Sequence, residues 1–531
     1  MSADPPSVAS HLMSHYSRRW LLIAILVIGA MSSMLAATIV NVALPSIIGA
    51  FGLGQDQAQW LSTAFLTSST GFMLLNTWAI ARFGMRRTFM TAMCIFIVGC
   101  FIGAASPNLE LLVAGRLLQG AGAGLIQPMA MLLIFRIFPE TSRGTAIGLY
   151  SLGVILSPAF GPVIGGLLVD QFDWRIVFIA TAPLAALAIP LGGAFLPPRE
   201  TSDVRPRLDW LGLALVIAAL GFALQGLAHG HREGWDDTGA VLRLAGAVAC
   251  TIAFLLWEMH HPFPILRLRL FAEPGFALAA VVILLTGLAI YGSTYLVPLF
   301  VQLIQHYSPT GAGLVLAPAG LAMAIGFPLA GRLSDHVDAR LLLAAGISMF
   351  GASMLLLSGL STFVSFTAMA GWVALSRFGI ATLMPAANAS AMRQVDPSML
   401  AFAAPAATFL TQTGGALGVA CLSVLLQERA AFHIDAMGPL MTEANPQAAE
   451  ALGRLAQASL EAGASAAAAA LNAERQLTSS MWLSAQVLAF RDCFVLIAWA
   501  FAGLLLAIPF LPKGRTIRKA QQAERKPIEI D

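Results

Sequence analysis

The sequence has little charge for its size. Asp, Glu, Lys and Arg make up 11% of the 531 residues, whereas 58% of the residues are hydrophobic. A soluble protein carries about a quarter charged residues, so this composition excludes an ordinary soluble domain. Apolar runs of about twenty residues recur along the chain, and this is the length that crosses a bilayer as a helix. The sequence therefore predicts an all-α polytopic membrane protein.

Groups that bind metals or catalyse reactions are also scarce within the apolar runs. The five cysteines are scattered without a CxxC pair, and none of the nine histidines lies deep in a run. Carboxylates such as Glu110, Asp170 and Glu258 lie at the ends of runs. A metal or catalytic centre needs several such groups to converge. We therefore expect no metal, no cofactor and no intramembrane enzyme, and a net charge of +3 gives no sign of nucleic-acid binding.

The apolar segments predict fourteen spans, with boundaries uncertain by a few residues. The segments are 20–44, 59–80, 88–106, 110–136, 144–169, 175–196, 210–228, 240–258, 276–303, 312–331, 341–360, 363–386, 402–426 and 490–511. Lys and Arg concentrate in the loops on one side, and such loops stay in the cytoplasm. Both termini are therefore predicted to be cytoplasmic.

The two halves of the sequence echo each other weakly. ARFGMRR follows the second predicted span and GRLSDHVDAR the tenth; GRLLQGAGAG surrounds Arg116 and SRFGIATLMP surrounds Arg377; GPVIGG is echoed by TGGALGVA. Their shared order relates spans 1–6 to spans 9–14 and leaves spans 7 and 8 over. Duplicated six-helix halves, with a substrate site between them near the midplane, are a transporter architecture.

This organisation predicts five parts of the chain. The Ala-rich segment 427–489 has a composition that favours helix, and its place between the last two spans predicts an extension on the periplasmic side. The parts are a cytoplasmic N-terminal tail (1–19), an N-terminal six-helix bundle (20–196), a linker with two extra transmembrane helices (197–275), a C-terminal six-helix bundle including the extension (276–511) and a basic cytoplasmic tail (512–531).

Arg116 and Arg377 are the ionisable residues placed deepest in predicted spans. A charge at mid-membrane costs about 2.5–3.5 kcal/mol on insertion scales and is usually functional. Arg116 either ties its helix to neighbouring carbonyl groups or takes part directly in transport, and the sequence leaves both roles open. Gln119, three residues on, shares its helix face.

Other polar or small residues mark further candidate positions. Thr38 and Asn41 are the polar residues of LAATIVNVALP (35–45) in the first span. Tyr291 and Tyr295, spaced i and i+4, either line a cavity or anchor their helix at the membrane interface. The segment GPVIGG has a small-residue face and a proline kink, which permit close packing and rocking between helices. Its candidate residues are Gly161, Pro162, Gly165 and Gly166.

At these residues the chain resembles the major facilitator superfamily, and within it the fourteen-span drug:proton antiporter branch of EmrB/QacA-type exporters. The resemblance rests on TIVNVALP, RLLQGAGAG, SPAFGPVIGG, DWRIVFIATAPLA, WEMHHPFPILRLRLF and YLVPLFVQLIQHYSPTGAGLVLAPAG. It implies two six-helix bundles plus two linker helices in a bacterial inner membrane, and proton-coupled efflux of hydrophobic small molecules by alternating access. It also implies a periplasmic adaptor protein and an outer-membrane channel as partners.

The resemblance further implies roles for individual residues. The loop motif after the second span keeps Arg82, Gly84 and Arg86, and its second copy keeps Gly331, Asp335 and Arg340, whereas Gln412 is kept in span 13.

The chain departs from the branch at several positions. Ala36 and Ala81 stand where the branch usually has aspartate, Thr77 stands where it usually has glycine, and Thr411 stands where it often has arginine. Without a deep carboxylate we expect the cavity to favour neutral or anionic compounds. Proton coupling must then use Glu110, Asp170 or the substrate itself. Two alternatives remain: a facilitator or importer of an anionic metabolite, and a non-transporting receptor or scaffold.

Overall fold

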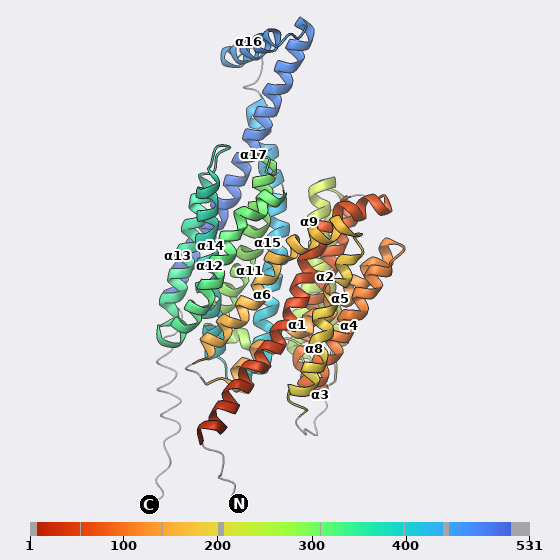
Figure 1. Ribbon diagram of the computed structural model, residues 1–531, viewed down its shortest axis with the longest axis vertical. Coiled ribbons are helices and arrows are strands. Elements are labelled where there is room, and N and C mark those ends of the chain that lie inside the picture. Colours follow the sequence, from red (N-terminus) through yellow and green to blue (C-terminus); the bar gives the residue numbers. More distant parts are fainter. Residues whose placement is uncertain are drawn as a thin grey trace, which may run out of the picture.

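The chain folds into long helices that stand side by side, with one helical arm projecting beyond them (Figure 1). The computed structural model describes residues 8–53, 55–139, 142–199, 207–307, 309–396, 399–438 and 445–510. The side chains of Asn41, Pro162, Asp170 and Asp335 lie outside the described residues. Within the described ranges all regular elements are helices, which confirms the predicted all-α class.

The first half of the chain forms one bundle. Its helices are α1 (Val8–Phe51), α2 (Gln55–Leu74), α3 (Asn76–Phe83), α4 (Met85–Ala105), α5 (Leu109–Ile137), α6 (Arg143–Gln171), α7 (Ile176–Ile179) and α8 (Ala182–Phe195). Helix α5 packs against α1, α2 and α4 and is therefore the central helix of this bundle. The buried face of α5 runs almost unbroken through its glycines and alanines.

The second half forms a matching bundle that continues into the projecting arm. Its helices are α11 (Pro274–Leu303), α12 (Pro309–His336), α13 (Ala339–Ser358), α14 (Phe366–Arg393), α15 (Leu400–Met437), α16 (Pro446–Glu461) and α17 (Ala466–Ala507). A short 3-10 helix, η5 (Ile508–Phe510), follows α17. Helix α16 contacts the outer part of α17, and the two form the arm (Figure 1).

A helical hairpin joins the bundles in sequence. It consists of α9 (Trp210–Glu233) and α10 (Thr238–His260) and is followed by the 3-10 helix η2 (Leu268–Ala272). Helix α9 also contacts α2 of the first bundle and α15 of the second. The hairpin therefore touches both halves of the molecule. The predicted boundaries of the five parts stay a prediction.

Twelve helices among the described residues are long and apolar enough to cross a membrane. The predicted spans 59–80 and 144–169 are helical over α2, α3 and α6, but these helices are not among the twelve. The count of fourteen spans therefore stays a prediction, as does the location of the termini.

Close helix pairs repeat between the bundles. A methyl group on Gly99 of α4 would meet the Gly115 carbonyl oxygen of α5 at 2.7 Å, and one on Gly346 of α13 would meet the Gly379 carbonyl oxygen of α14 at 2.8 Å. Only glycine lets these backbones approach so closely. The same pairing of helices, α4 with α5 and α13 with α14, is thus built twice, with the close glycine contacts at different positions along the helices.

The two bundles meet at one end of the molecule. We call it the basic end, because Arg82, Arg86, Arg332 and Arg340 lie there. There α6 crosses α12, and a methyl group on Gly331 would lie 2.5 Å from the Gly144 carbonyl oxygen. A second contact between the bundles joins α3 and α15, where the Thr77 hydroxyl donates a hydrogen bond of 2.5 Å to the Ala401 carbonyl.

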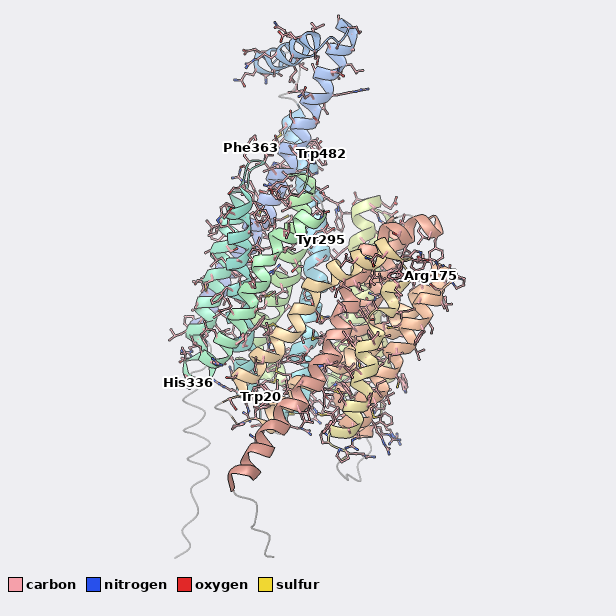
Figure 2. The ribbon with its side chains drawn as sticks, viewed as in Figure 1. Trp20, Arg175, Tyr295, His336, Phe363 and Trp482 are labelled. Carbon is pink, nitrogen blue, oxygen red and sulfur yellow. The ribbon has the colours of Figure 1, made fainter. Side chains whose placement is uncertain are left out.

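Side chains mark the two ends in Figure 2. Trp20 and His336 lie at the basic end, whereas Arg175, Phe363 and Trp482 lie toward the arm.

Candidate functional site

Arg116 lies at the centre of the first bundle and is 1% exposed. Its Nε donates to the Leu61 carbonyl of α2 at 2.9 Å, and its Nη1 donates to the Ala36 carbonyl of α1 at 3.0 Å. The guanidinium also lies 4.4 Å from the centre of the Phe65 ring. Arg116 therefore links three helices. Its Nη2 is buried without a hydrogen-bond partner in the described part of the chain.

A chain of buried polar contacts leads on from Arg116. Its Nη1 also donates to Gln119 Oε1 at 2.9 Å, and Gln119 Nε2 donates to the Cys100 sulfur at 3.2 Å. Cys100 lies 3.5 Å from the Thr181 hydroxyl, between α7 and α8. The network thus reaches from α1 and α2 to α4 and α8. It fixes the Gln119 amide so that its oxygen faces the arginine.

Thr38 lies at the contact between α1 and α6. Its hydroxyl donates within its own helix, to the Met34 and Leu35 carbonyls at 3.3 Å. A methyl group on Gly161 would overlap the Thr38 hydroxyl. The glycine therefore permits the close approach that the small-residue face predicts. Gly161 and Gly165 are buried and Gly166 is half-buried.

Arg377 occupies the corresponding place in the second bundle. It is 5% exposed, and it binds α11 rather than two different helices. Its Nη1 donates to the Ser293 hydroxyl at 2.9 Å, and its Nη2 donates to the Thr294 hydroxyl at 2.8 Å. A longer contact of 3.4 Å joins Nη1 to the Ile290 carbonyl. Side-chain hydroxyls therefore replace most of the backbone carbonyls that hold Arg116.

The predicted tyrosine pair lies on the same stretch of α11. The Tyr291 hydroxyl donates a 2.5 Å hydrogen bond to Gln412 Oε1 of α15. The Tyr291 ring lies against Gly415, where a methyl group would overlap it. Tyr295 is half-buried one turn further toward the arm (Figure 2). The structure thus brings Arg377, Tyr291 and Gln412 into one neighbourhood of the second bundle.

The loop motif of the first bundle holds the chain after α8. Gly84 has φ +82°, a conformation that favours glycine, and a methyl group there would lie 2.8 Å from the Arg199 Cα. Arg86 Nε donates to the Leu196 carbonyl at 2.8 Å. Arg82 is half-buried in the last turn of α3, where a positive charge suits the helix dipole.

The second copy of the motif lies where the bundles meet. Gly331 is buried against Gly144, as described above. The Arg340 backbone N–H donates to the Asp338 carboxylate at 3.0 Å, which caps α13. The Arg340 Nε is buried without a hydrogen-bond partner among the described residues. The two copies therefore differ: the first secures a loop, and the second lies at a helix crossing between the bundles.

Positive charge dominates the buried interior of both bundles. Neither Arg116 nor Arg377 forms an ion pair with a carboxylate in the part of the chain that the structure describes. Their charges are held by carbonyl and hydroxyl oxygens instead.

Sequence reasoning placed Glu258 at the end of a span and did not predict that Asp209 and Glu258 are buried, with exposed fractions of 2% and 4%. The first precedes α9 and the second lies in the last turn of α10, so the sequence places both at span ends. Their positions in the sequence could have indicated the contact. Two consecutive spans form an antiparallel hairpin, which brings the start of the first span beside the end of the second.

Two matched helical bundles, each with a buried arginine, joined by a membrane hairpin, define a polytopic membrane transporter. The chain belongs to the Major Facilitator Superfamily, because the model of that family matches residues 8–419.

Relatives cover most of the chain. An uncharacterized MFS-type transporter, YhcA of Bacillus subtilis, is 26% identical over 514 residues, which are 96% of this chain and 95% of YhcA. The multidrug export protein EmrB of Escherichia coli is 27% identical over 78% of this chain and 81% of its own. The fatty acid resistance protein FarB of Neisseria gonorrhoeae is 28% identical over 75% of this chain and 79% of its own.

A solved structure shows the same fold. The human organic anion transporter MFSD10 superposes with a TM-score of 0.60 at 12% identity, over 92% of this chain and 99% of that chain. At this identity the likeness concerns the fold alone.

Proposed function

We propose that the protein exports hydrophobic small molecules, neutral or anionic ones preferentially, by proton-coupled alternating access. The observation that carries the proposal is the sign of the buried charge. Arg116 and Arg377 lie in matching positions, and no carboxylate pairs with either among the described residues. A lipophilic cation would meet unfavourable charge in such an interior, whereas an anion would not.

The contact between the bundles supports alternating access. At the basic end α6 and α12 cross through Gly144 and Gly331, without large side chains between the backbones. Such a crossing can slide or separate without repacking a large apolar surface. Rocking of one bundle against the other about a central site is the common mechanism of duplicated transporters.

The names of the relatives support export and an anionic substrate class. EmrB is named for multidrug export, and FarB is named for fatty acid resistance. A fatty acid is a lipophilic weak acid, which is the substrate chemistry that the buried arginines favour. The comparisons favour neither the importer nor the receptor alternative.

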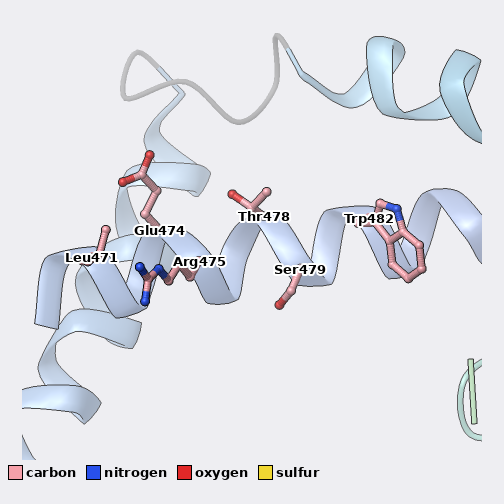
Figure 3. Close-up of a pocket in the computed structure, with 6 residues that line it drawn as sticks. All are labelled: Leu471, Glu474, Arg475, Thr478, Ser479 and Trp482. Carbon is pink, nitrogen blue, oxygen red and sulfur yellow. The ribbon is translucent and has the colours of Figure 1, made fainter. Parts of the chain in front are cut away.

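We propose that the basic end faces the cytoplasm of a bacterium and that the arm projects into the periplasm. Excess Lys and Arg on one side supports this orientation. The arm carries a surface pocket lined by Leu471, Glu474, Arg475, Thr478, Ser479 and Trp482 of α17 (Figure 3). This pocket is on the arm and is separate from the buried arginines of the bundles. A periplasmic adaptor protein would reach this surface and would connect the exporter to an outer-membrane channel.

Reconstituted protein tests the transport proposal. A pH gradient is imposed on liposomes, and one lipophilic weak acid and one lipophilic cation are followed separately. We expect gradient-driven movement of the acid alone, lost in Arg116→Ala and retained in the control Arg175→Ala, whose side chain is exposed. Movement of the cation would refute the charge argument. Equal accumulation of the acid with and without the gradient would refute proton coupling.

A separate experiment tests the adaptor proposal. Deletion of residues 446–461 removes α16 from the arm. We expect export across both membranes of cells to fall, while transport in inner-membrane vesicles is retained. Equal loss in cells and vesicles would contradict a role in partner binding.

A further inference from the structure

Asp209 and Glu258 form a buried acid pair at the basic end of the α9–α10 hairpin. Asp209 is the N-cap residue of α9, and Glu258 lies in the last turn of α10. Their exposed fractions of 2% and 4% are those of core residues. Buried carboxylates need partners that offset their desolvation, so the contacts of each oxygen decide what the pair can bind.

Each carboxyl group has one oxygen with donors and one without. Asp209 Oδ1 accepts from the Gly212 N–H at 2.8 Å and from Trp257 Nε1 at 2.9 Å. Glu258 Oε2 accepts from the Leu266 N–H at 3.3 Å. Asp209 Oδ2 and Glu258 Oε1 are buried and have no hydrogen-bond partner among the described residues.

The two oxygens without donors face the same point. A methyl group built on Gly212 would lie 2.5 Å from Asp209 Oδ2 and 2.8 Å from Glu258 Oε1. The oxygens are therefore no further apart than these two distances together, and glycine leaves the space between them free of a side chain.

A histidine nitrogen adds a third acceptor beside them. His261 Nδ1 lies 3.5 Å from Asp209 Oδ2, and it accepts a hydrogen bond from the Phe263 N–H at 3.3 Å. In the tautomer in which Nδ1 accepts this hydrogen bond, it has no proton to donate to the aspartate. Three acceptors thus converge without a donor in the described surroundings. What this arrangement lacks is a proton.

We propose that the acid pair binds one proton, shared between Asp209 Oδ2 and Glu258 Oε1. Two buried carboxylates this close cannot both be ionised without a large penalty, and one shared proton turns the repulsion into a hydrogen bond. Asp209, Glu258 and His261 do not form a group that could hold a metal ion among the described residues, which favours a proton.

The surrounding charges do not neutralise the pair. The nearby segments carry His260, whose Nδ1 contacts the Leu256 carbonyl, and the arginines at 207, 267 and 269. Arg207 and Arg269 are exposed. Among the described residues, the packed helices α2 and α15 bring no ionisable side chain to this end.

Arg267 connects the acid pair to the contact between the bundles. It follows Leu266, which donates to Glu258, and its guanidinium lies 3.9 Å from the centre of the Phe402 ring. Its Nη1 also donates to the Met399 sulfur at 3.3 Å. Phe402 is next to Ala401, whose carbonyl receives the hydrogen bond from the first bundle.

Proton binding is thereby linked to conformation. The shared proton stabilises the present arrangement, in which the bundles meet at the basic end. Loss of the proton leaves two facing negative charges, which drive Glu258 away and pull on the Leu266 N–H and the start of α15. This linkage deepens the proposed proton coupling, and its role in transport rests on that proposal. The existence of the proton site does not depend on the proposed coupling.

Infrared difference spectroscopy of the purified full-length protein tests the site. The carbonyl stretch of a protonated carboxyl group is followed as pH is raised, in wild type and in Glu258→Gln, Asp209→Asn and the exposed control Glu273→Gln. We expect one band, lost on alkalinisation, to be absent in Glu258→Gln. It should titrate at lower pH in Asp209→Asn, where the facing negative charge is gone and the asparagine still caps α9. The control should match wild type. A band that titrates identically in Glu258→Gln would overturn the proposal.

Spin labels test the linkage. Phe83 and Leu341 are exposed residues at the basic end of different bundles. We expect their separation to increase with pH in wild type and to stay short at all pH values in Glu258→Gln, which mimics the protonated acid. The same pH dependence in both proteins, or none in wild type, would overturn the linkage. Absence of substrate flux from liposomes would refute the transport proposal and leave the infrared band unchanged, so the two failures are distinguishable.

Discussion

Restoring a carboxylate at position 36 is the sharpest perturbation of the buried charge. Ala36 is 2% exposed, and its carbonyl oxygen lies 3.0 Å from Arg116 Nη1. Arg116 Nη2 is buried without a partner among the described residues. The substitution Ala36→Asp therefore introduces an anion beside a guanidinium that still has an unused donor.

The coupling between the two charges can be worked from this geometry. For two unit charges about 4 to 6 Å apart, Coulomb's law with an effective dielectric constant of about 20 gives roughly 3 to 4 kcal/mol. The larger side chain in a packed core opposes this by about 1 to 3 kcal/mol. Ala36→Asp should thus change the stability of wild type little. In an Arg116→Gln background it should be strongly destabilising, because the carboxylate then has no cation.

A double-mutant cycle measures this coupling. The free energy of unfolding is determined in mixed micelles for wild type, Ala36→Asp, Arg116→Gln and the double variant. We expect a coupling free energy of about 3 kcal/mol. In liposomes the single variant Ala36→Asp should also gain transport of a lipophilic cation, because the net positive charge of the interior falls. A coupling within about 0.5 kcal/mol of zero, the ordinary scatter for independent sites, would refute the geometry that places Arg116 beside α1.

Three further predictions concern other parts of the molecule. Gly84→Ala should lower the free energy of unfolding by about 1 to 3 kcal/mol, because φ +82° strains any other residue and Arg199 fills the space; an unchanged denaturation midpoint would contradict this. Tyr291→Phe leaves the Gln412 oxygen buried without its donor, so we expect a loss of about 1 to 3 kcal/mol in the same assay, and no loss would mean that water replaces the hydroxyl. A hydrogen bond with His229 lowers the pKa of Asp237 below its usual value. The free energy that this contact adds to folding is therefore fully present above the ordinary carboxyl pKa and is lost as pH falls through the lowered pKa. When the free energy of unfolding is followed during acid titration, Asp237→Asn should lack this loss.

Composition and motifs predicted the class of fold because the membrane imposes it. Apolar runs of twenty residues can satisfy their backbone only as helices, so the all-α class and most spans could be read directly. The repeat was also readable, since GRLLQGAGAG around Arg116 and SRFGIATLMP around Arg377 recur in the same order in the two halves. Arg116 stood out because a charge is rare in an apolar run.

The partners of these residues could not be predicted. Whether Arg116 meets a carboxylate, a carbonyl group or a cavity depends on how three helices pack, and no local pattern encodes that. The burial of Asp209 and Glu258 was missed for a related reason. Each lies at the end of an apolar run, where a carboxylate normally faces water, and only the folding of the chain around residues 261–267 buries them.

Helix α17 runs without interruption from the arm into the second bundle and contains 42 residues. At 1.5 Å per residue it is about 63 Å long, roughly twice the hydrocarbon thickness of a bilayer. Such a helix is a lever with its fulcrum in the membrane. A tilt of about 5° in the bundle would swing an outer half of about 30 Å by roughly 3 Å at its tip. A change of helix tilt in the bundle would therefore displace the tip of the arm outside the membrane. A load on the tip would in turn resist that tilt.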